Sequence, residues 1–117
     1  MTGAGIGTDM LDIPRMARLI KNPAFMARVY SERENAYIAS KGTGAAAAAA
    51  GIFCAKEALA KATGKGLLSL LRSGEEVLHD EGGKPRFARS AAALSITHTA
   101  SLASAVVLMQ NIPQNGE

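Results

Sequence analysis

The stretch that decides the fold is residues 45–66, AAAAAAGIFCAKEALAKATGKG. Strong helix formers fill it almost without interruption, and two glycines close it, which predicts one central helix over Ala45–Thr63. One face of this helix is an apolar stripe at 3.6-residue spacing, which predicts packing against a core. The stripe consists of Ala48, Ile52, Ala55, Leu59 and Ala62.

The opposite face carries Glu57 and Lys61, four residues apart. Such pairs usually lie on the surface, where they contribute only about 0.3 kcal/mol. Phe53 and Cys54 precede the pair by one turn on the same side, which favours a cleft or an interface over open solvent. The third flank is expected to face water. It consists of Ala49, Lys56 and Ala60.

Composition restricts the class of protein. The chain has 117 residues, of which 48% are hydrophobic, and this length predicts a single domain over residues 1–117 with its own core. We find no secretory signal pattern and no apolar run long enough to span a bilayer. The single cysteine, Cys54, excludes an internal disulfide and fits a reducing compartment, so we expect a cytoplasmic protein without membrane association.

Charge is uneven along the chain. Residues 13–31 carry Arg15, Arg18, Lys21 and Arg28 but no acidic residue. Solvated helix faces usually mix both signs, so this segment is as consistent with an acidic partner as with water alone. Nucleic acid is the weaker candidate, because aromatic residues are few and no nucleic-acid-binding signature is present.

Patterning elsewhere predicts short helices and strands around the central helix. Ser31 and Glu34 have the spacing of a capping box, and Thr43 is a candidate cap for the central helix. The last two strands are expected to form a hairpin, and residues 110–117 a frayed tail. The helices are expected over residues 14–20, 25–30, 31–40 and 67–71, a short helix or loop over 90–93, and the strands over 4–13, 76–79, 85–88, 94–98 and 102–109. The fold class is therefore α+β, with a mainly C-terminal antiparallel sheet packed on a long central helix.

Three separated pieces carry the chemistry. Asp9 ends a Gly-x-Gly segment whose glycines are expected to allow close backbone approach, Glu57 and Lys61 share one helix side, and residues 95–99, SITHT, lie at a strand end. Two carboxylates from different elements suit Mg²⁺, which takes oxygen ligands and retains positions for a substrate phosphate. A lysine one turn away can bind the same phosphate or protonate a leaving group. No cluster of Cys and His supports zinc.

Four motifs together resemble the holo-[acyl-carrier-protein] synthases, which are small phosphopantetheinyl transferases. The motifs are GIGTD at residues 5–9, FCAKEA at 53–58 followed by Lys61, GKP at 83–85 and SITHT at 95–99, in the family's order between Gly5 and Leu108. The resemblance implies a 4′-phosphopantetheinyl transferase-like fold. It also implies Mg²⁺-dependent transfer of 4′-phosphopantetheine from coenzyme A to a serine of apo acyl carrier protein, releasing adenosine 3′,5′-bisphosphate.

The resemblance also implies roles for individual residues. Asp9 and Glu57 would hold the metal on the coenzyme A pyrophosphate, Lys61 would stabilise or protonate the leaving phosphate, and the general base stays open between the two carboxylates. Ile52 stands where the family usually has an arginine that is expected to help hold coenzyme A. The positions that match the family's coenzyme A contacts are Lys61, Lys65, Gly66, Lys84, Pro85, His98 and Thr99.

Partners follow from the same resemblance. Arg15 matches a residue that meets the carrier protein, and because carrier proteins are acidic, Arg18 and Arg28 are candidate contacts too. Family members of this length are homotrimers with active sites between subunits. The rival hypothesis is a non-catalytic module that keeps the fold and binds the carrier or the nucleotide, and a nucleotide-dependent hydrolase is a third. Whether the carrier serves fatty-acid or polyketide synthesis is left open.

Overall fold

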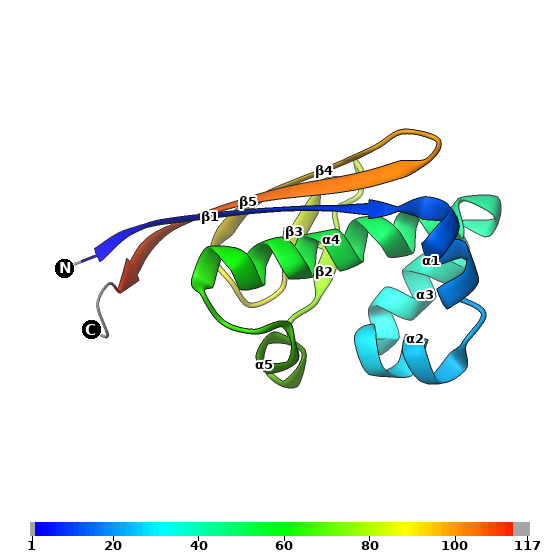
Figure 1. Cartoon of the computed structure of the whole chain (residues 1–117), viewed down its shortest axis with the longest axis horizontal. Helices are drawn as coiled ribbons and strands as arrows, with labels where there is room; N and C mark the ends of the chain where they lie inside the picture. Colours follow the sequence, from blue (N-terminus) through cyan, green and yellow to red (C-terminus); the bar gives the residue numbers. More distant parts are fainter. Residues whose placement is uncertain (1, 114–117) are drawn as a thin grey trace.

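A long helix, α4 (Ala45–Thr63), lies against one face of an antiparallel sheet in the computed structural model, which describes residues 2–113 (Figure 1). The sheet contains β1 (Thr2–Asp12), β4 (Ala92–His98) and β5 (Leu102–Pro113) in the order β1-β5-β4. The N-terminal strand thus pairs with the C-terminal strand, and the expected α+β class with a long central helix is confirmed.

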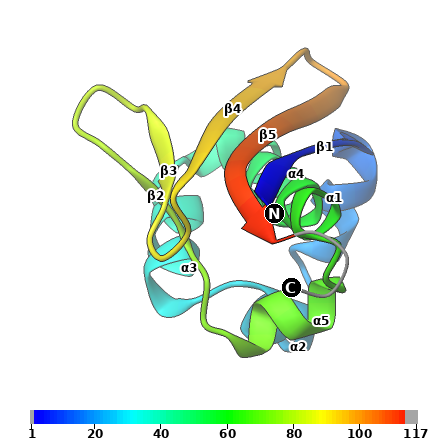
Figure 2. The ribbon, with the colours of Figure 1, turned by 90° about the vertical axis from the view of Figure 1, so that its left-hand side faces the viewer.

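The remaining elements surround α4 on the sides that the sheet leaves open. Three short helices, α1 (Ile13–Leu19), α2 (Pro23–Val29) and α3 (Glu32–Ser40), gather at one end of α4 (Figures 1 and 2). A 3₁₀ turn (Gly42–Gly44) leads into α4, and α5 (Leu67–Arg72) lies on the side of α4 away from the sheet. A separate hairpin of β2 (Val77–His79) and β3 (Pro85–Phe87) projects beside β4 (Figure 2).

Alternation along the sheet separates a buried face from an open one. Ala103, Ala105 and Val107 of β5 point toward α4 and are buried, whereas Val106 and Leu108 point outward and are exposed. The β4–β5 hairpin, predicted from the sequence, is confirmed, and its turn is closed by backbone amides of Ser101 and Leu102 that donate to the Thr99 hydroxyl.

Gly7 fixes how closely β1 crosses α4. A Cβ atom at this position would lie 1.8 Å from the carbonyl oxygen of Ala58, so only glycine fits there. A Cβ at Gly51 would similarly lie 2.9 Å from Cγ2 of Ile96 on β4. The expectation that the Gly-x-Gly segment serves close approach is confirmed at Gly7. Asp9, two residues further along β1, lies on the same inward side.

Helix caps agree with the sequence at one predicted site and differ at another. The capping box is confirmed: the amide of Glu34 donates to Ser31 Oγ (3.2 Å), and the amide of Ser31 donates to Glu34 Oε1 (2.9 Å). Thr43 does not cap α4, because the 3₁₀ turn makes Gly44 the N-cap, without a side-chain hydrogen bond. Asp12 caps α1 by accepting from the amide of Arg15 at 2.9 Å.

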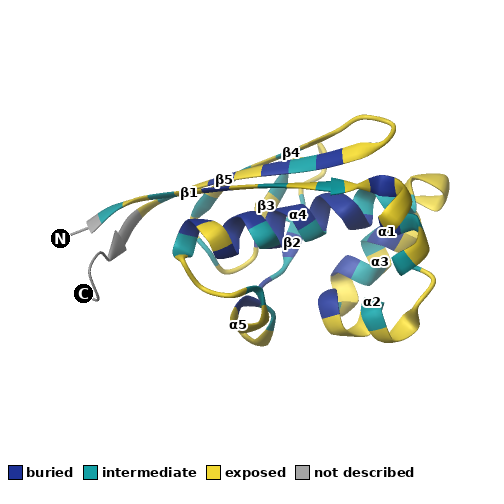
Figure 3. Cartoon of the chain, viewed as in Figure 1, coloured by how far each residue is buried: buried dark blue, intermediate teal, exposed yellow. Residues whose placement is uncertain are grey.

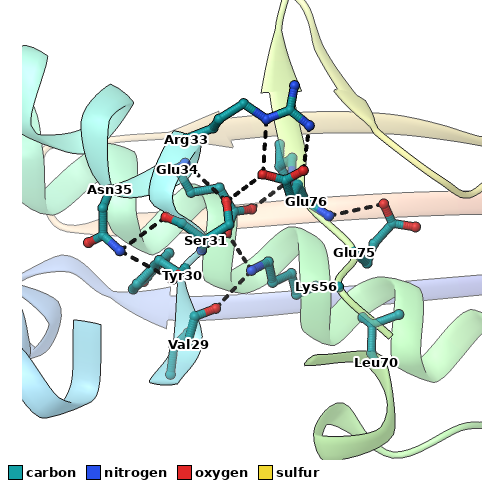
Figure 4. Close-up of polar contacts among 12 residues, drawn as sticks. Val29, Tyr30, Ser31, Arg33, Glu34, Asn35, Lys56, Leu70, Glu75 and Glu76 are labelled. Atoms are coloured by element: carbon teal, nitrogen blue, oxygen red, sulfur yellow. Dashed lines mark hydrogen bonds and ion pairs between the residues drawn. The ribbon is translucent and has the colours of Figure 1, made fainter. Parts of the chain in front are cut away.

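The flank of α4 that was expected to face water is buried, so that prediction is wrong. Lys56 is 2% exposed and Ala49 0%, and Figure 3 shows much of α4 in the colour of buried residues. The reason is that α3 and β2 pack against α4 and that the lysine finds two oxygen partners, one on α3 and one on the last residue of α2. Lys56 Nζ donates to Glu34 Oε1 at 2.5 Å and to the carbonyl oxygen of Val29 at 2.8 Å, within a wider polar network (Figure 4).

Element boundaries differ from the predictions in the C-terminal third. β4 begins at Ala92, within the segment expected to be helix or loop, and β5 continues to Pro113 because it pairs with β1 as far as Thr2. The tail expected from residue 110 therefore overlaps a strand, and residues 114–117 lie outside the described part of the chain. Within residues 2–113, no helix has the length and apolar character needed to cross a membrane.

Candidate active site

The three residues predicted to carry catalysis come together where β1 crosses α4. Asp9 lies on the inward side of β1, and Glu57 and Lys61 lie one turn apart on α4. Lys61 Nζ donates to the carbonyl oxygen of Thr8 at 2.9 Å and lies 3.5 Å from Asp9 Oδ1. The close passage at Gly7 is what brings these groups from two distant segments within reach of one another.

Charge at this crossing is incompletely balanced. Partial burial raises the pKa of Glu57 above its usual value, the negative charge of Asp9 raises it further, and Lys61 opposes both effects. The raised pKa of Glu57 beside a second carboxylate, despite a neighbouring ammonium, means that negative charge is in excess here and favours an additional cation. The crossing is therefore a candidate site for a metal ion.

The carboxylates of Asp9 and Glu57 fit Mg²⁺ as part of a ligand set that a substrate completes. Among residues 2–113, no group of three or more His, Cys, Asp and Glu side chains is placed to hold a metal. Asp9 and Glu57 supply hard carboxylate oxygens from two side chains, and Mg²⁺ is typically bound by one or two carboxylates together with water and substrate phosphate oxygens. The residues present thus fit Mg²⁺ shared with a phosphorylated substrate.

Cys54 lies next to this crossing but does not have the properties of a nucleophile. Its side chain is buried, and its thiol contacts the carbonyl oxygen of Ala103 at 3.6 Å. Burial raises the pKa of Cys54 to about 12, with the negative charge of Asp9 as the next cause. The thiol is therefore protonated at neutral pH, in line with a core role.

A separate cavity of about 340 Å³ contains two of the positions predicted to contact the nucleotide, Pro85 and His98. Its α4 wall includes Gly51 and Ile52, so the residue that replaces the family's usual arginine faces the same space as His98. The rest of the wall comes from α3, the following turn and the β2–β3 hairpin. The cavity's lining includes neither Asp9, Glu57 nor Lys61.

Three residues of this cavity were missed by sequence reasoning: Tyr37, Lys41 and His79. The rings of Tyr37 and His79 stack with centroids 3.8 Å apart, and Lys41 Nζ lies 4.7 Å from the Tyr37 centroid. Burial lowers the pKa of His79, and the charge of Lys41 lowers it further. The i,i+4 spacing of Tyr37 and Lys41 was the available signal, but nothing in the sequence placed His79 against them.

The other predicted coenzyme A contacts do not line this cavity. Lys65 and Gly66 are exposed in the link between α4 and α5, where Gly66 is the N-cap of α5. Lys84 is exposed in the β2–β3 turn, and Thr99 lies in the β4–β5 turn. Within one chain, the structure brings together the catalytic trio and, elsewhere, Pro85 with His98, but not all predicted contacts in one place.

The predicted carrier-protein contacts lie on the surface of two neighbouring helices. Arg15 and Arg18 are exposed on α1, and Arg28 is exposed on α2. None of the ion pairs observed between described residues involves these three arginines. Within the described residues, their charges are therefore not neutralised by a neighbouring carboxylate.

Comparison with known proteins gives one consistent result. Residues 5–108 match the family model described as the 4′-phosphopantetheinyl transferase superfamily. The chain is 37% identical over 112 residues to a holo-[acyl-carrier-protein] synthase of Alkaliphilus metalliredigens, covering 95% of this chain and 91% of that protein. It is 40% identical over 114 residues to a Listeria monocytogenes holo-[acyl-carrier-protein] synthase, covering 91% and 97%.

Solved structures agree with the sequence comparison. A holo-(acyl-carrier-protein) synthase from Bacillus anthracis in complex with CoA (3′,5′-ADP) superposes with a TM-score of 0.80 at 31% identity, covering 95% of this chain and 99% of that one. The Neisseria meningitidis holo-[acyl-carrier-protein] synthase gives a TM-score of 0.76 at 30% identity, covering 89% and 95%. This chain therefore belongs to the 4′-phosphopantetheinyl transferase superfamily, among the holo-[acyl-carrier-protein] synthases.

Proposed function

We propose that this chain transfers 4′-phosphopantetheine from coenzyme A to a serine of apo acyl carrier protein and releases adenosine 3′,5′-bisphosphate. The observation that carries the proposal is the meeting of Asp9, Glu57 and Lys61 where β1 crosses α4. Family membership indicates the two substrates, coenzyme A and apo acyl carrier protein. The carboxylates of Asp9 and Glu57 and the ammonium of Lys61 support a site for Mg²⁺ and a pyrophosphate group at this crossing.

Asp9 and Glu57 would hold Mg²⁺, which when bound neutralises charge on the pyrophosphate of coenzyme A. Lys61 keeps its ammonium beside these carboxylates through its bond to the Thr8 carbonyl oxygen. In that place it can neutralise the negative charge that develops on the oxygen leaving with adenosine 3′,5′-bisphosphate. Positioning and charge neutralisation account for most catalysis of phosphoryl transfer, and these three side chains provide both.

The serine hydroxyl must lose a proton as its oxygen bonds to the β-phosphorus and the pyrophosphate P–O bond breaks. Glu57 is one candidate base for that proton. Asp9, alone or through a water, is the second candidate base.

A trimer would complete the site. The outer face of the sheet is apolar and has no covering element within residues 2–113, which is unusual for an isolated soluble chain. Its exposed apolar side chains are Ile6, Met10, Leu102, Val106 and Leu108. Within one chain the Pro85–His98 cavity is separate from the catalytic trio. A coenzyme A molecule bound at the trio would therefore need the cavity of a neighbouring subunit.

A Val106→Glu variant should sediment with a lower mass than the native assembly in analytical ultracentrifugation, and it should lose transfer activity.

The acidic carrier protein would dock on the exposed arginines of α1 and α2, and the reaction would take place in the cytoplasm. The free Cys54 supports that location.

The direct test is mass spectrometry of apo acyl carrier protein after incubation with the purified chain, coenzyme A and Mg²⁺. We expect the carrier to gain the mass of one phosphopantetheine, and we expect no gain when EDTA removes the metal. Calorimetry separates this function from the non-catalytic alternative. Binding of the carrier without Mg²⁺-dependent binding of coenzyme A would favour a binding module, whereas cleavage of coenzyme A without any carrier would favour a hydrolase.

A further inference from the structure

Glu75 is a buried acidic residue that takes no part in the catalytic crossing. It is 4% exposed and lies between α5 and β2, directly before Glu76. Burying a carboxylate away from water costs free energy unless hydrogen bonds replace the lost hydration. The groups that donate these hydrogen bonds therefore indicate what Glu75 does.

The carboxylate of Glu75 joins the two ends of the β2–β3 hairpin. Its Oε1 accepts from the amide of Glu76 at 3.0 Å, just before β2, and from the amide of Arg89 at 2.8 Å, two residues after β3 (Figure 4 shows the first of these contacts). Its Oε2 accepts from Ser90 Oγ at 2.6 Å. One side chain thus connects the segment that enters the hairpin with the segment that leaves it.

The hairpin depends on such connections because it is short and pairs apart from the main sheet. Within the described residues, β2 and β3 pair over three residues each and form a two-stranded sheet separate from β1, β5 and β4. A two-stranded hairpin is marginally stable by itself in water. Glu34 and Glu76 attach the β2 side to α3, through the Val77 amide and Ser31 Oγ. Glu75 extends this attachment to the β3 side.

The other end of the same hairpin forms part of the 340 Å³ cavity. His79 and Pro85 pair across the two strands, and both line the cavity together with Gly83 from the turn. A change at the base of the hairpin therefore moves this wall of the cavity. We propose that Glu75 is a positioning residue for coenzyme A, which acts by holding the hairpin that carries His79 and Pro85. This inference rests on the proposed function, in which the cavity receives the nucleotide part of coenzyme A.

Two substitutions at position 75 distinguish positioning from a general loss of stability. Glu75→Ala removes all three contacts, whereas Glu75→Gln can still accept from both amides and can donate to Ser90 Oγ. We expect the KM for coenzyme A to rise about tenfold in Glu75→Ala and by less than about threefold in Glu75→Gln. The kcat and the KM for apo carrier protein should stay within about threefold of native in both variants. A merely destabilised enzyme would instead lose active protein and show a lower kcat at an unchanged KM.

Two further variants provide a graded comparison and a control. Ser90→Ala removes one of the three contacts and leaves the carboxylate with its two amide donors, so the KM for coenzyme A should rise about threefold. Glu32→Ala removes an exposed carboxylate from α3 and should leave this KM unchanged. If Glu75→Ala does not fold, Ser90→Ala decides the inference: a KM at least twofold above native supports it, and an unchanged KM overturns it.

Hydrogen–deuterium exchange tests the connection without any reaction. In Glu75→Ala, peptides from residues 77–88 should exchange at least about fivefold faster than in the native chain, while peptides from residues 45–63 keep their native rates. Unchanged protection of the hairpin overturns the inference. Equal acceleration in both segments also overturns it, because Glu75 would then stabilise the whole fold rather than position the hairpin.

The outcomes separate the inference from the function beneath it. Native transfer with an unchanged KM for coenzyme A in Glu75→Ala overturns the positioning role and leaves the function intact. If the native chain transfers nothing, the function fails, and calorimetry with adenosine 3′,5′-bisphosphate decides the inference. At least fivefold weaker binding by Glu75→Ala, with near-native binding by Glu75→Gln, supports it. Equal affinities, or no binding by the native chain, overturn it.

Discussion

Two lysine–carboxylate contacts lie on different flanks of α4, and they differ in how completely their charges are satisfied. Lys56 and Glu34 are 2% and 0% exposed and lie 2.5 Å apart, and Glu34 also accepts from the backbone amides of Ser31 and Val77. Lys61 and Asp9 lie 3.5 Å apart and are 56% and 19% exposed. The same residue types thus produce a closed network on one flank and an open one on the other.

This difference in charge pairing distinguishes the structural flank of α4 from the flank that can bind a ligand. On the Lys56 flank the lysine and its carboxylate have protein partners, and no buried side-chain nitrogen or oxygen within the described residues lacks a hydrogen bond. On the Glu57 flank the protein leaves two carboxylates facing one another, and the pKa of Glu57 is raised by burial first and by the charge of Asp9 second. A closed network has no remaining capacity for a ligand, whereas an open one gains by binding a cation and a phosphate.

Breaking the closed network should have the largest effect on stability. Lys56→Met leaves Glu34 buried without its cation and should lower the free energy of unfolding by about 3–5 kcal/mol. Lys61→Met is the matched control: its side chain is half-exposed, so the free energy should change by less than about 1 kcal/mol. Urea denaturation at one fixed protein concentration measures both. Equal losses in the two variants would mean that burial does not distinguish the two contacts.

Replacing both members of the closed pair sharpens the comparison further. Since an apolar pair needs no charge compensation, Lys56→Met combined with Glu34→Leu should recover part of the stability lost in the single variant. Additive losses would contradict an ion pair as the main reason for the burial of Lys56.

Removing one charge from the open network should affect catalysis instead. Glu57→Gln removes a carboxylate from the proposed metal site, so transfer should fall about 10²–10³-fold, equivalent to roughly 3–4 kcal/mol. The free energy of unfolding should stay the same or rise, because the folded chain no longer holds two facing carboxylates. Glu32→Gln, on the exposed surface of α3, is the control and should keep full activity. Transfer within tenfold of native in Glu57→Gln would exclude Glu57 as a metal ligand and base.

Gly7 sets the close crossing of β1 and α4 on which the open network depends, and it offers a third test. Gly7→Ala places a Cβ against the Ala58 carbonyl oxygen, so β1 must move away from α4, at a cost of about 1–3 kcal/mol in the free energy of unfolding. Transfer should fall as well, because Asp9 moves with the strand. Gly82→Ala is the control, since nothing lies within 4 Å of a Cβ there. An unchanged stability for Gly7→Ala would show that the crossing has room to relax.

The open network could be predicted from the sequence, and the closed one could not. Glu57 and Lys61 share a side of one helix, and Asp9 follows a glycine segment that permits close approach, so local patterns suggested their meeting. Lys56 gave the opposite impression, because helical periodicity says where a side chain points but not which element covers it. Its partner Glu34 belongs to another helix, and its sequence signal, the capping box, suggested only a local role.

Long-range pairing explains the other failures. The stacking of Tyr37 on His79 joins a helix to a hairpin strand, and no local pattern indicates that contact. Pro113 and Gly116 suggested a tail from residue 110, but β5 continues to Pro113 because that end of the strand pairs with β1 at Thr2. Local preference decides an element's type, while distant partners decide its length and its burial.

Glu76 lies at the edge of the closed network, where it accepts from Ser31 and Arg33. Its replacement should change the free energy of unfolding least, and the change should depend on pH. Hydrogen bonds from Arg33 and then Ser31 lower the pKa of Glu76 to about 2 from an ordinary value of 4.5. Because the folded pKa is lowered, Glu76 adds stability above pH 4.5, and this contribution disappears as the pH falls toward 2. Glu76→Gln should therefore be less stable than native at pH 6 by less than about 1 kcal/mol, since Arg33 is exposed. Urea denaturation at pH 6, 4 and 3 should show this difference shrinking, whereas a difference independent of pH would mean that packing, rather than charge, gives Glu76 its role.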